Sequence, residues 1–477
     1  MPATMTKAVA FYLAGEAKTS EQLHAVLAKH DDLLIAEVSL ANRDDVDRAI
    51  ASCVAARRSM RELPMHARRS ILLHTARRLC ERKNDIAMML AREVGKTVKE
   101  AKGEIVRAIE TFTLAAEECS RLTGEFARAD ASPRAEGYFS ITKRVPIGAC
   151  SLIVPFNFPI NLAAHKVAPA IAAGCPFVLK PDTDCPLAVL MLAEILAETD
   201  LPRGAWSVMP MDDEARTLMS EDERFNLLTF TGSPKVGWAL KATAGRKKVV
   251  LELGGNAACI VHEDADLDRA VDRLMIGGFA VAGQSCISVQ RILAHRSIYN
   301  DLRDRLARRV RALNVGDPLD DDTDIGPLFH KNACDRIEAW LTDATKAGAT
   351  VLVGGKARKP FFEPTIVENV PHDASLSCQE VFGPLVTLEP YDDFDDALRI
   401  ADDSEYGLQA GVFTSDIGRI LKAFDELEVG GLVVNDPPTM RIDAQPYGGT
   451  KKSGIGREGV RYAIEDMTEI RHLLLRA

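Results

Sequence analysis

Short apolar runs alternate with helical segments over residues 149–252, and this alternation limits the fold of the chain more than any other feature. Strands are predicted at 149–154, 176–180, 205–209, 226–230 and 247–252, with helices that begin near Ile160, Cys185, Asp213 and Ser233. Alternation at this spacing is typical of a parallel sheet covered by helices. Ligands of such sheets bind at the carboxyl ends of the strands. Four polar side chains fall there: Asn157, Lys180, Ser233 and Glu252.

A second alternation of strands and helices begins after Asn256 and continues to about Asn435. Its predicted strands are 257–261 and 289–294, and its predicted helices are 266–280, 297–313 and 333–347. The spacing indicates a second α/β domain.

The two ends of the chain have weaker patterns. Helices are predicted from Asp44, from Pro64 and over 98–121, and strands at 35–38 and 137–146. The last forty residues are predicted to alternate loop and short strand. Four arginines of the second helix are predicted to face water: Arg68, Arg69, Arg77 and Arg78.

Composition excludes several classes of partner. The chain has 477 residues, a size that favours two or three domains, and its formal net charge is −10. A net negative charge argues against nucleic acid or an anionic membrane surface as a partner. No apolar run reaches the length of a membrane span, and the first residues lack the pattern of a signal peptide, so we expect a cytoplasmic protein. The ten cysteines have no zinc-ligand spacing, and no metal site is expected.

Two turns rich in small residues carry a carboxylate and a thiol. Glu252 ends an apolar run and precedes Gly254-Gly255, and Cys286 lies in Gly283-Gln284-Ser285-Cys286. A base and a sulfur nucleophile are what covalent catalysis at a carbonyl carbon needs. Taken singly, Cys286 also fits a buried structural cysteine and Glu252 fits turn chemistry.

Seven motifs, in order along nearly the whole chain, resemble those of the aldehyde dehydrogenase superfamily. They are Phe156-Asn157-Phe158-Pro159, Leu179-Lys180-Pro181, Phe230-Thr231-Gly232-Ser233, Glu252-Leu253-Gly254-Gly255, Gly283-Gln284-Ser285-Cys286, Glu380-Val381-Phe382-Gly383-Pro384, and Pro446-Tyr447-Gly448-Gly449 with Lys452-Ser453-Gly454. The segment 435–443 is similar to the lactaldehyde and succinate-semialdehyde branches.

The resemblance implies an α/β fold of the aldehyde dehydrogenase type, with a Rossmann-type cofactor domain, an α/β catalytic domain and a small β oligomerisation element. The implied divisions are a cofactor-binding domain in two parts (1–120 and 146–253), an oligomerisation arm (121–145), a catalytic domain (254–435) and a C-terminal oligomerisation segment (436–477). A homodimer or homotetramer is expected, because an isolated strand pair exposes edges that need covering.

The resemblance also implies catalytic roles. Cys286 is expected to attack an aldehyde and form a thiohemiacetal, and Glu252 to activate water that hydrolyses the later thioester. Asn157 is expected to donate its side-chain N–H to the oxyanion, together with the backbone N–H of Cys286. The expected activity is NAD(P)-dependent oxidation of an aldehyde to a carboxylic acid.

The expected cofactor contacts are Lys180, Thr183, Gly232, Ser233, Glu380 and Phe382. Family members that use NAD often have Glu at the position of Thr183, where a carboxylate repels a 2′-phosphate. Threonine removes this repulsion, so NADP is expected to be accepted, with NAD also possible. The flanking carboxylates Asp182 and Asp184 weaken this inference.

The substrate is less well specified. Arg107 and Arg441 are candidate partners for an anionic aldehyde, although a solvent-exposed or structural role fits each as well. Ser285 stands where many relatives that bind anions have Arg. Three alternatives stay open: transfer of the acyl group to coenzyme A, which Glu252 argues against; a nucleotide-binding scaffold without turnover; and reductive use on an activated acid.

Overall fold

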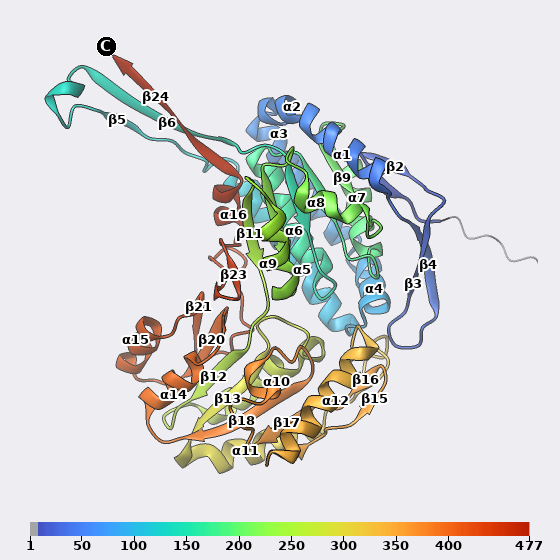
Figure 1. Cartoon of the computed structure of the whole chain (residues 1–477), viewed down its shortest axis with the longest axis vertical. Coiled ribbons are helices and arrows are strands. Elements are labelled where there is room, and N and C mark those ends of the chain that lie inside the picture. The colour runs from blue at the N-terminus through green and yellow to red at the C-terminus, as the bar shows by residue number, and fades with distance from the viewer. Residues whose placement is uncertain (1–7, 477) are drawn as a thin grey trace, which may run out of the picture.

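The computed structural model describes residues 8–476 and contains two large sheets, which lie one above the other in Figure 1. The first sheet has the strand order β2-β1-β9-β8-β7-β10-β11-β23. Its strands are β1 (Phe11–Leu13), β2 (Glu16–Lys18), β7 (Cys150–Ile153), β8 (Phe177–Lys180), β9 (Trp206–Val208), β10 (Leu227–Thr231), β11 (Lys248–Glu252) and β23 (Gly454–Ile455).

The five central strands of this sheet are parallel, as the alternation over 149–252 predicts. Helices α6 (Pro159–Ala173), α7 (Leu187–Ala197) and α9 (Pro234–Thr243) confirm three of the four helices predicted between them. The fourth, near Asp213, is reduced to a 3-10 turn at Ala215–Thr217 and the short α8 (Leu218–Glu221). The carboxyl ends of the strands face the second domain.

The first part of the chain forms five helices, of which the first packs on β8 and β9 and the third, fourth and fifth pack on α6 or α7. They are α1 (Arg43–Ala55), α2 (Arg57–Glu62), α3 (Met65–Glu81), α4 (Lys83–Val94) and α5 (Val98–Glu118). Helix α5 begins with a capping box, in which the Thr97 hydroxyl accepts the Glu100 N–H and the Glu100 carboxylate accepts the Thr97 N–H. Pro64 is the N-cap of α3 rather than its first helical residue.

The prediction that Arg68 faces water is wrong. Its guanidinium is buried and donates to the carbonyls of Ala172, Met60 and Arg61. Gly174, which ends α6 with φ +82°, has no side chain to occupy the space that this guanidinium fills. Arg68 therefore satisfies carbonyls at a helix end, a role that its charge run does not reveal.

Three of the four strands before residue 40 were not predicted. β1 and β2 extend the first sheet, while β3 (Leu23–Leu27) and β4 (Leu34–Ser39) form an antiparallel hairpin; only β4 matches the strand predicted at 35–38.

The second sheet has the order β14-β17-β18-β13-β12-β20-β21. Its strands are β12 (Ala257–Val261), β13 (Val289–His295), β14 (Thr350–Val353), β17 (Thr365–Glu368), β18 (Leu385–Tyr391), β20 (Gln409–Phe413) and β21 (Gly431–Val434). Its helices are α10 (Leu267–Phe279), α11 (Arg296–Arg311), α12 (Lys331–Lys346), α13 (Ser375–Cys378), α14 (Phe394–Asp402) and α15 (Ile417–Glu426). All five elements predicted over 257–347 are confirmed. Two small pairs complete this half, β15 (Ala357–Arg358) with β16 (Phe361–Phe362) and β19 (Tyr406–Gly407) with β22 (Thr450–Lys451).

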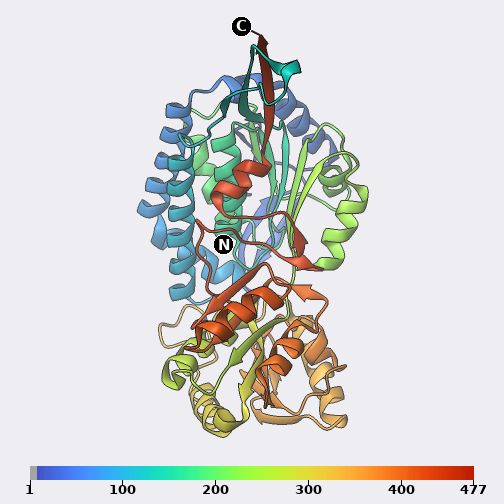
Figure 2. The ribbon, with the colours of Figure 1, turned by 90° about the vertical axis from the view of Figure 1, so that its left-hand side faces the viewer.

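A third, narrow sheet extends away from the body of the molecule (Figures 1 and 2). It joins β5 (Phe126–Arg128), β6 (Tyr138–Pro146) and β24 (Thr468–Arg476) in the order β24-β6-β5. We call these three strands the arm. The strand predicted at 137–146 is confirmed as β6. The prediction of loop and short strand for the last forty residues is correct for β22 and β23 but misses helix α16 (Val460–Asp466) and the nine-residue β24.

The chain passes from the first sheet to the second between Glu252, the last residue of β11, and Ala257, the first residue of β12. The segment after 435 contributes to three sheets, since β22 pairs with β19, β23 pairs with β11 and β24 pairs with β6. The domain boundaries given above stay a proposal. Within residues 8–476, no helix is both long and apolar enough to cross a membrane.

Candidate active site

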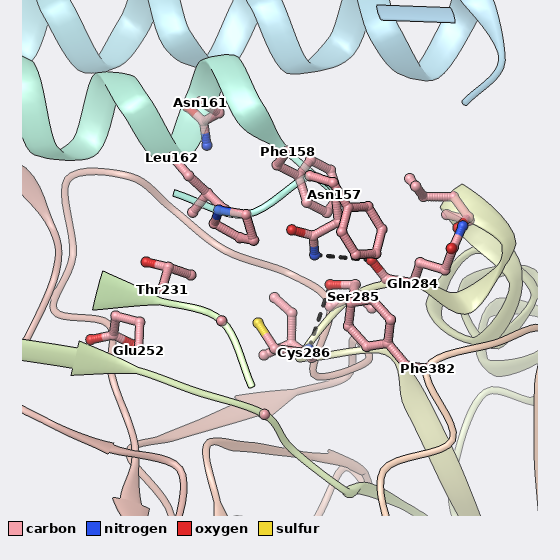
Figure 3. A pocket seen from close by; sticks show the side chains of 18 of the residues that line it. Asn157, Phe158, Asn161, Leu162, Thr231, Glu252, Gln284, Ser285, Cys286 and Phe382 are labelled. Atoms are coloured by element: carbon pink, nitrogen blue, oxygen red, sulfur yellow. Dashed lines mark hydrogen bonds between the residues drawn. The ribbon is translucent and has the colours of Figure 1, made fainter. Parts of the chain in front are cut away.

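A cavity of ≈ 770 Å³ lies between the two halves of the molecule. Nine of the eleven site residues named from the sequence line it: Arg107, Asn157, Gly232, Ser233, Glu252, Cys286, Glu380, Phe382 and Arg441. Figure 3 shows the Cys286 side chain with Glu252 on one side, Phe382 on the other and Asn157 above. The first sheet contributes Glu252 from the end of β11, and the second half contributes Cys286 from the loop between α10 and β13.

The loop that presents Cys286 begins with a strained turn. Val281, Ala282 and Gly283 have φ values of +54°, +53° and +67°. This region is unfavourable for a β-branched residue such as valine. Glu100 of α5 accepts the Val281 N–H at 2.6 Å and so holds the turn from the other half of the molecule.

The Cys286 thiol is protonated in the resting site. Its desolvation raises the pKa to about 12, although a hydrogen bond from Tyr447 opposes the rise. The Cys286 Sγ and Tyr447 Oη atoms lie 3.1 Å apart. A thiolate therefore forms only with the help of a base or of the substrate.

Glu252 is buried, and neither of its carboxyl oxygens has a hydrogen-bond partner. Burial raises its pKa well above the usual range, and the charge of Glu458 raises it further. The glycines around it are required by close approach: a Cβ at Gly448 would lie 2.8 Å from Glu252 Oε1. An unpartnered carboxyl with a raised pKa beside a thiol is typical of a general base kept for a reacting group.

Asn157 lies at the turn before α6, where its side-chain N–H donates to the Gln284 carbonyl at 3.0 Å. A buried ion pair positions this turn. Lys96 Nζ donates to the Asn157 carbonyl at 2.6 Å and to Glu104 at 2.5 Å, and Glu104 accepts the backbone N–H groups of Ile160 and Asn161. The amide is thus held beside the nucleophile loop, one residue from the peptide that includes the Cys286 N–H.

The cavity continues towards Gly232, Ser233, Glu380 and Phe382. Ser233 is the N-cap of α9 and makes no side-chain capping bond, so the first N–H groups of this ten-residue helix point to a ready anion site. Glu380 accepts the Gly255 N–H at 3.0 Å, and burial raises its pKa to about 7. Phe382 has φ +48°, a strained value for an aromatic residue, of the kind that collects at ligand sites.

Lys180 and Thr183 are outside the lining of this cavity. Lys180 Nζ donates to the Pro181 carbonyl at 3.2 Å, and burial, with a smaller effect of nearby Arg216, lowers its pKa. Asp184 lies 2.9 Å from His24 Nε2, and Asp182 accepts the Asp184 N–H at 3.0 Å. Both carboxylates that flank Thr183 therefore have partners within the chain.

Arg107 and Arg441 meet at one buried carboxylate, Asp443. Arg107 donates to it twice, at 3.0 and 2.6 Å, and Arg441 Nε lies 3.4 Å from it. Burial would raise the pKa of Asp443, but hydrogen bonds from His165 and Arg107 outweigh burial and hold the pKa well below the usual range. The solvent-exposed interpretation is wrong for Arg441, whose side chain is 6% exposed, whereas Arg107 is 32% exposed.

Arg441 also connects this carboxylate to the nucleophile. Its guanidinium carbon lies 3.8 Å from the centre of the Tyr447 ring, and its Nη2 donates to Glu458 at 3.0 Å. Glu458 in turn lies 3.0 Å from Lys166 Nζ. Burial alone would raise the pKa of Glu458, but Lys166 and Arg441 lower it to about 2, so the pKa values of Glu458 and Glu252 are shifted in opposite directions.

Sequence reasoning assigned no role to five residues of this network: His165, Lys166, Asp443, Tyr447 and Glu458. One feature of the sequence could have indicated part of this network. His165 and Lys166 are adjacent polar residues in a run rich in alanine, which forms α6, and all fifteen residues of this helix are buried. A buried lysine needs a carboxylate partner, and nothing in the sequence indicates that this partner is Glu458.

Comparison with known proteins gives a consistent result over the whole chain. Residues 16–473 match the model of the aldehyde dehydrogenase family. The 3-sulfolactaldehyde dehydrogenase of Priestia aryabhattai is 43% identical over 473 residues, 99% of each chain. Aldehyde dehydrogenase 21 from Physcomitrella patens, solved in complex with the reaction product succinate, is 44% identical with a TM-score of 0.97 and covers 98% of each chain. Glyceraldehyde-3-phosphate dehydrogenase from Methanocaldococcus jannaschii, complexed with NADP, is 37% identical with a TM-score of 0.92, over 96% of this chain and 100% of that chain.

Proposed function

Because the chain belongs to the aldehyde dehydrogenase family, we propose that it oxidises a short anionic aldehyde to the carboxylic acid with NAD or NADP. One observation carries the proposal. The Cys286 thiol, the unpartnered Glu252 carboxyl and the side chains of Arg107 and Arg441 line the same cavity, and Asp443, outside the lining, contacts both arginines. A nucleophile, a base and two cations can thus act on one small molecule.

Cys286 performs the first step by attack on the aldehyde carbon. The sulfur–carbon bond forms, the thiol proton leaves to Glu252 in its ionised form, and the carbonyl oxygen gains negative charge. The backbone N–H of Cys286 and the side-chain N–H of Asn157, once released from the Gln284 carbonyl, stabilise that oxygen. Each such donor typically contributes about 3 kcal/mol.

Glu252 performs the second step, the hydrolysis of the thioester on Cys286. After the proton from the thiol has passed to solvent, Glu252 takes a proton from a water molecule, the water oxygen bonds to the acyl carbon, and the sulfur–carbon bond breaks to release the acid and return Cys286 as a thiolate. This role favours water over coenzyme A as the acyl acceptor. The presence of Glu252, Cys286 and Asn157 in one cavity also argues against a scaffold without turnover.

The residues present fit a nicotinamide dinucleotide. The uncapped N-terminus of α9 suits a pyrophosphate, and Glu380, with one carboxyl oxygen free of protein donors, suits ribose hydroxyls. When bound there, NAD(P)⁺ would supply the hydride acceptor.

Three features favour NADP as one accepted form. Position 183 is Thr, the carboxylates of Asp182 and Asp184 have partners within the chain, and Arg216 lies close enough to Lys180 to affect its pKa. Two neighbouring cations, Lys180 and Arg216, would suit a 2′-phosphate.

The relatives support a short anionic substrate. One is named for 3-sulfolactaldehyde, and another was solved with succinate, a product that retains a second carboxylate. An aldehyde with its anionic group a few bonds away would place that group near Arg107 and Arg441 while Cys286 attacks.

A steady-state screen tests this function. It measures nicotinamide reduction by NAD and NADP with succinate semialdehyde, 3-sulfolactaldehyde and propanal, with and without coenzyme A, for the wild type and Cys286→Ala. We expect reduction with the anionic aldehydes, no requirement for coenzyme A, and loss of activity in the variant. Reduction only in the presence of coenzyme A would contradict the hydrolytic mechanism, and preference for propanal would contradict the anionic substrate.

A further inference from the structure

The loop between β8 and α7 carries two carboxylates at the carboxyl end of a parallel strand. It follows Lys180, the last residue of β8, and contains Asp182, Thr183 and Asp184. In a doubly wound sheet, such a loop is where an acidic side chain receives a ribose hydroxyl of NAD or a cation receives the 2′-phosphate of NADP. The charge that this loop presents therefore bears on which of the two cofactors binds.

Both carboxylates of this loop lie within electrostatic range of the cavity. Burial lowers the pKa of His330, which lines the cavity, and the charges of Asp182 and Asp184 oppose this shift. Burial also lowers the pKa of Lys180, and Asp182 opposes that shift as well. A change in the direction of either carboxylate would thus be felt by a dinucleotide bound in the cleft.

His24 of β3 determines where the Asp184 carboxylate points. The His24 Nε2 and Asp184 Oδ1 atoms lie 2.9 Å apart. Because a carboxylate only accepts hydrogen bonds, the imidazole is the donor in its neutral or its charged form. The two side chains are 32% and 45% exposed, and an exposed pair of this kind contributes little to stability. Its effect is to direct the carboxylate towards the β3–β4 hairpin.

The hairpin that carries His24 is held in place at its tip. Lys29 Nζ lies 4.2 Å from the centre of the Phe329 ring, and Lys331 forms an ion pair with Asp32. Phe329 and Lys331 belong to the second half of the molecule, whereas β4 leads directly into α1 of the first half (Figure 1). The position of His24 is therefore fixed by contacts on both sides of the cofactor cleft.

We propose that His24 is a specificity-determining residue that favours NADP over NAD, because it holds the Asp184 carboxylate away from the ribose end of the cofactor. The inference rests on the proposed function and deepens its choice of cofactor. Without His24, the Asp184 carboxylate is free to turn towards the cleft. There it would repel a 2′-phosphate and accept a hydrogen bond from the 2′-hydroxyl of NAD.

Fluorescence titration of the full-length protein with NADPH and NADH tests the proposal. The preference is the ratio of the Kd for NADH to the Kd for NADPH. His24→Ala should lower this ratio by about fivefold to tenfold. His24→Gln should keep the ratio near that of the wild type, because its amide N–H can still reach Asp184. A loss of structure alone would weaken both cofactors equally and leave the ratio unchanged.

A double variant shows whether the Asp184 carboxylate carries the effect. When His24→Ala is added to Asp184→Asn, no carboxylate is released, so the ratio should change by less than about twofold. His74→Ala is the matched control. His74 is also partly exposed and pairs with a carboxylate, Glu198, at 3.2 Å, but Glu198 follows the opposite end of α7 and both residues are outside the cavity lining. Its ratio should equal that of the wild type.

His24→Asn provides a second route if His24→Ala is unstable, because its shorter amide cannot reach Asp184 and the same fall in the ratio is expected. Three results would overturn the inference: an unchanged ratio in the folded single variants, an equal fall in the Asp184→Asn background, or no binding of NADPH by a wild type that binds NADH. Absence of binding of both dinucleotides to the wild type would instead count against the proposed function.

Discussion

At the scale of single residues, the hydrogen bond between Tyr447 and Cys286 controls how readily the thiolate forms. This bond lowers the pKa of Cys286 against the larger effect of burial. Tyr447→Phe removes it, so the pKa should rise and alkylation of Cys286 by iodoacetamide should slow by about fivefold to tenfold at a given pH. Mass spectrometry of the Cys286 peptide measures the rate, and exposed Cys80 in the same sample is the internal reference.

The pH dependence of this alkylation follows from the same pKa. Because only the thiolate reacts and the pKa is about 12, the wild-type rate should rise about tenfold per pH unit between about pH 7 and pH 10, without a plateau. Tyr462→Phe, a change of the same kind outside the cavity lining, should match the wild type. A plateau near neutral pH would show that the thiol is already ionised in the resting enzyme.

The residues that carry the chemistry were predictable because their motifs are local. Cys286, Glu252 and Asn157 each lie in a short run whose residue types suit one role. Asp443, Glu458 and Lys166 were not predictable, because their roles depend on contacts between segments 278 and 292 residues apart in sequence. A carboxylate in a loop gives no sign of which arginine it will meet.

At the scale of elements, α5 joins the two halves of the active site. Glu104 holds the turn of Asn157, and Glu100, one turn earlier, holds the strained turn before Cys286. Glu100→Ala removes the acceptor for the Val281 N–H. Because this turn presents the Cys286 N–H to the oxyanion, we expect kcat to fall by about tenfold to a hundredfold with a smaller change in KM.

Glu100→Gln should recover most of the activity, because its amide oxygen can still accept this N–H. Lys102→Ala, an exposed change on the same helix, is the control. If Glu100→Ala changes only the melting temperature and leaves kcat unaltered, the contact stabilises the fold without positioning the nucleophile.

Most elements were predictable from periodicity alone, as β7 to β11 and β12 to α12 illustrate. The strands that periodicity did not predict share one property. β1, β2 and β3 have three to five residues each, and β23 has two, so none shows a period of its own. Their conformation is imposed by the partner strand, which tertiary structure supplies.

At the scale of the whole molecule, the arm leaves apolar side chains uncovered. Ile470, Leu473, Leu474 and Leu475 of β24 are 50–66% exposed, and Phe126 of β5 is 70% exposed. An exposed apolar strand pair of this size suits association with a second copy of the chain, as a homodimer or homotetramer would provide.

A double change in β24 tests this association. Ile470→Asp with Leu474→Asp places charges on one face of the strand, and light scattering should then report a shift from oligomer to monomer at micromolar concentration. Leu33→Asp is the control, since Leu33 is 67% exposed in the β3–β4 hairpin, far from the arm in Figure 1. An unchanged mass for the double variant would exclude this face of β24 from the contact.

The pairing of β6 with β24 also sets the order in which the molecule is completed during translation. Pro146 pairs with Thr468, so 322 residues must be added before β6 meets its partner. At roughly 5–20 residues per second this interval is about 15–65 s. Arg441, Tyr447 and Glu458 arrive in the same late segment, which also supplies β23 beside the strand of Glu252. A ribosome-bound chain that ends before residue 441 therefore contains the nucleophile and the base but lacks Arg441, Tyr447 and Glu458 from the cavity lining. We expect activity to begin only after nearly the whole chain has been synthesised.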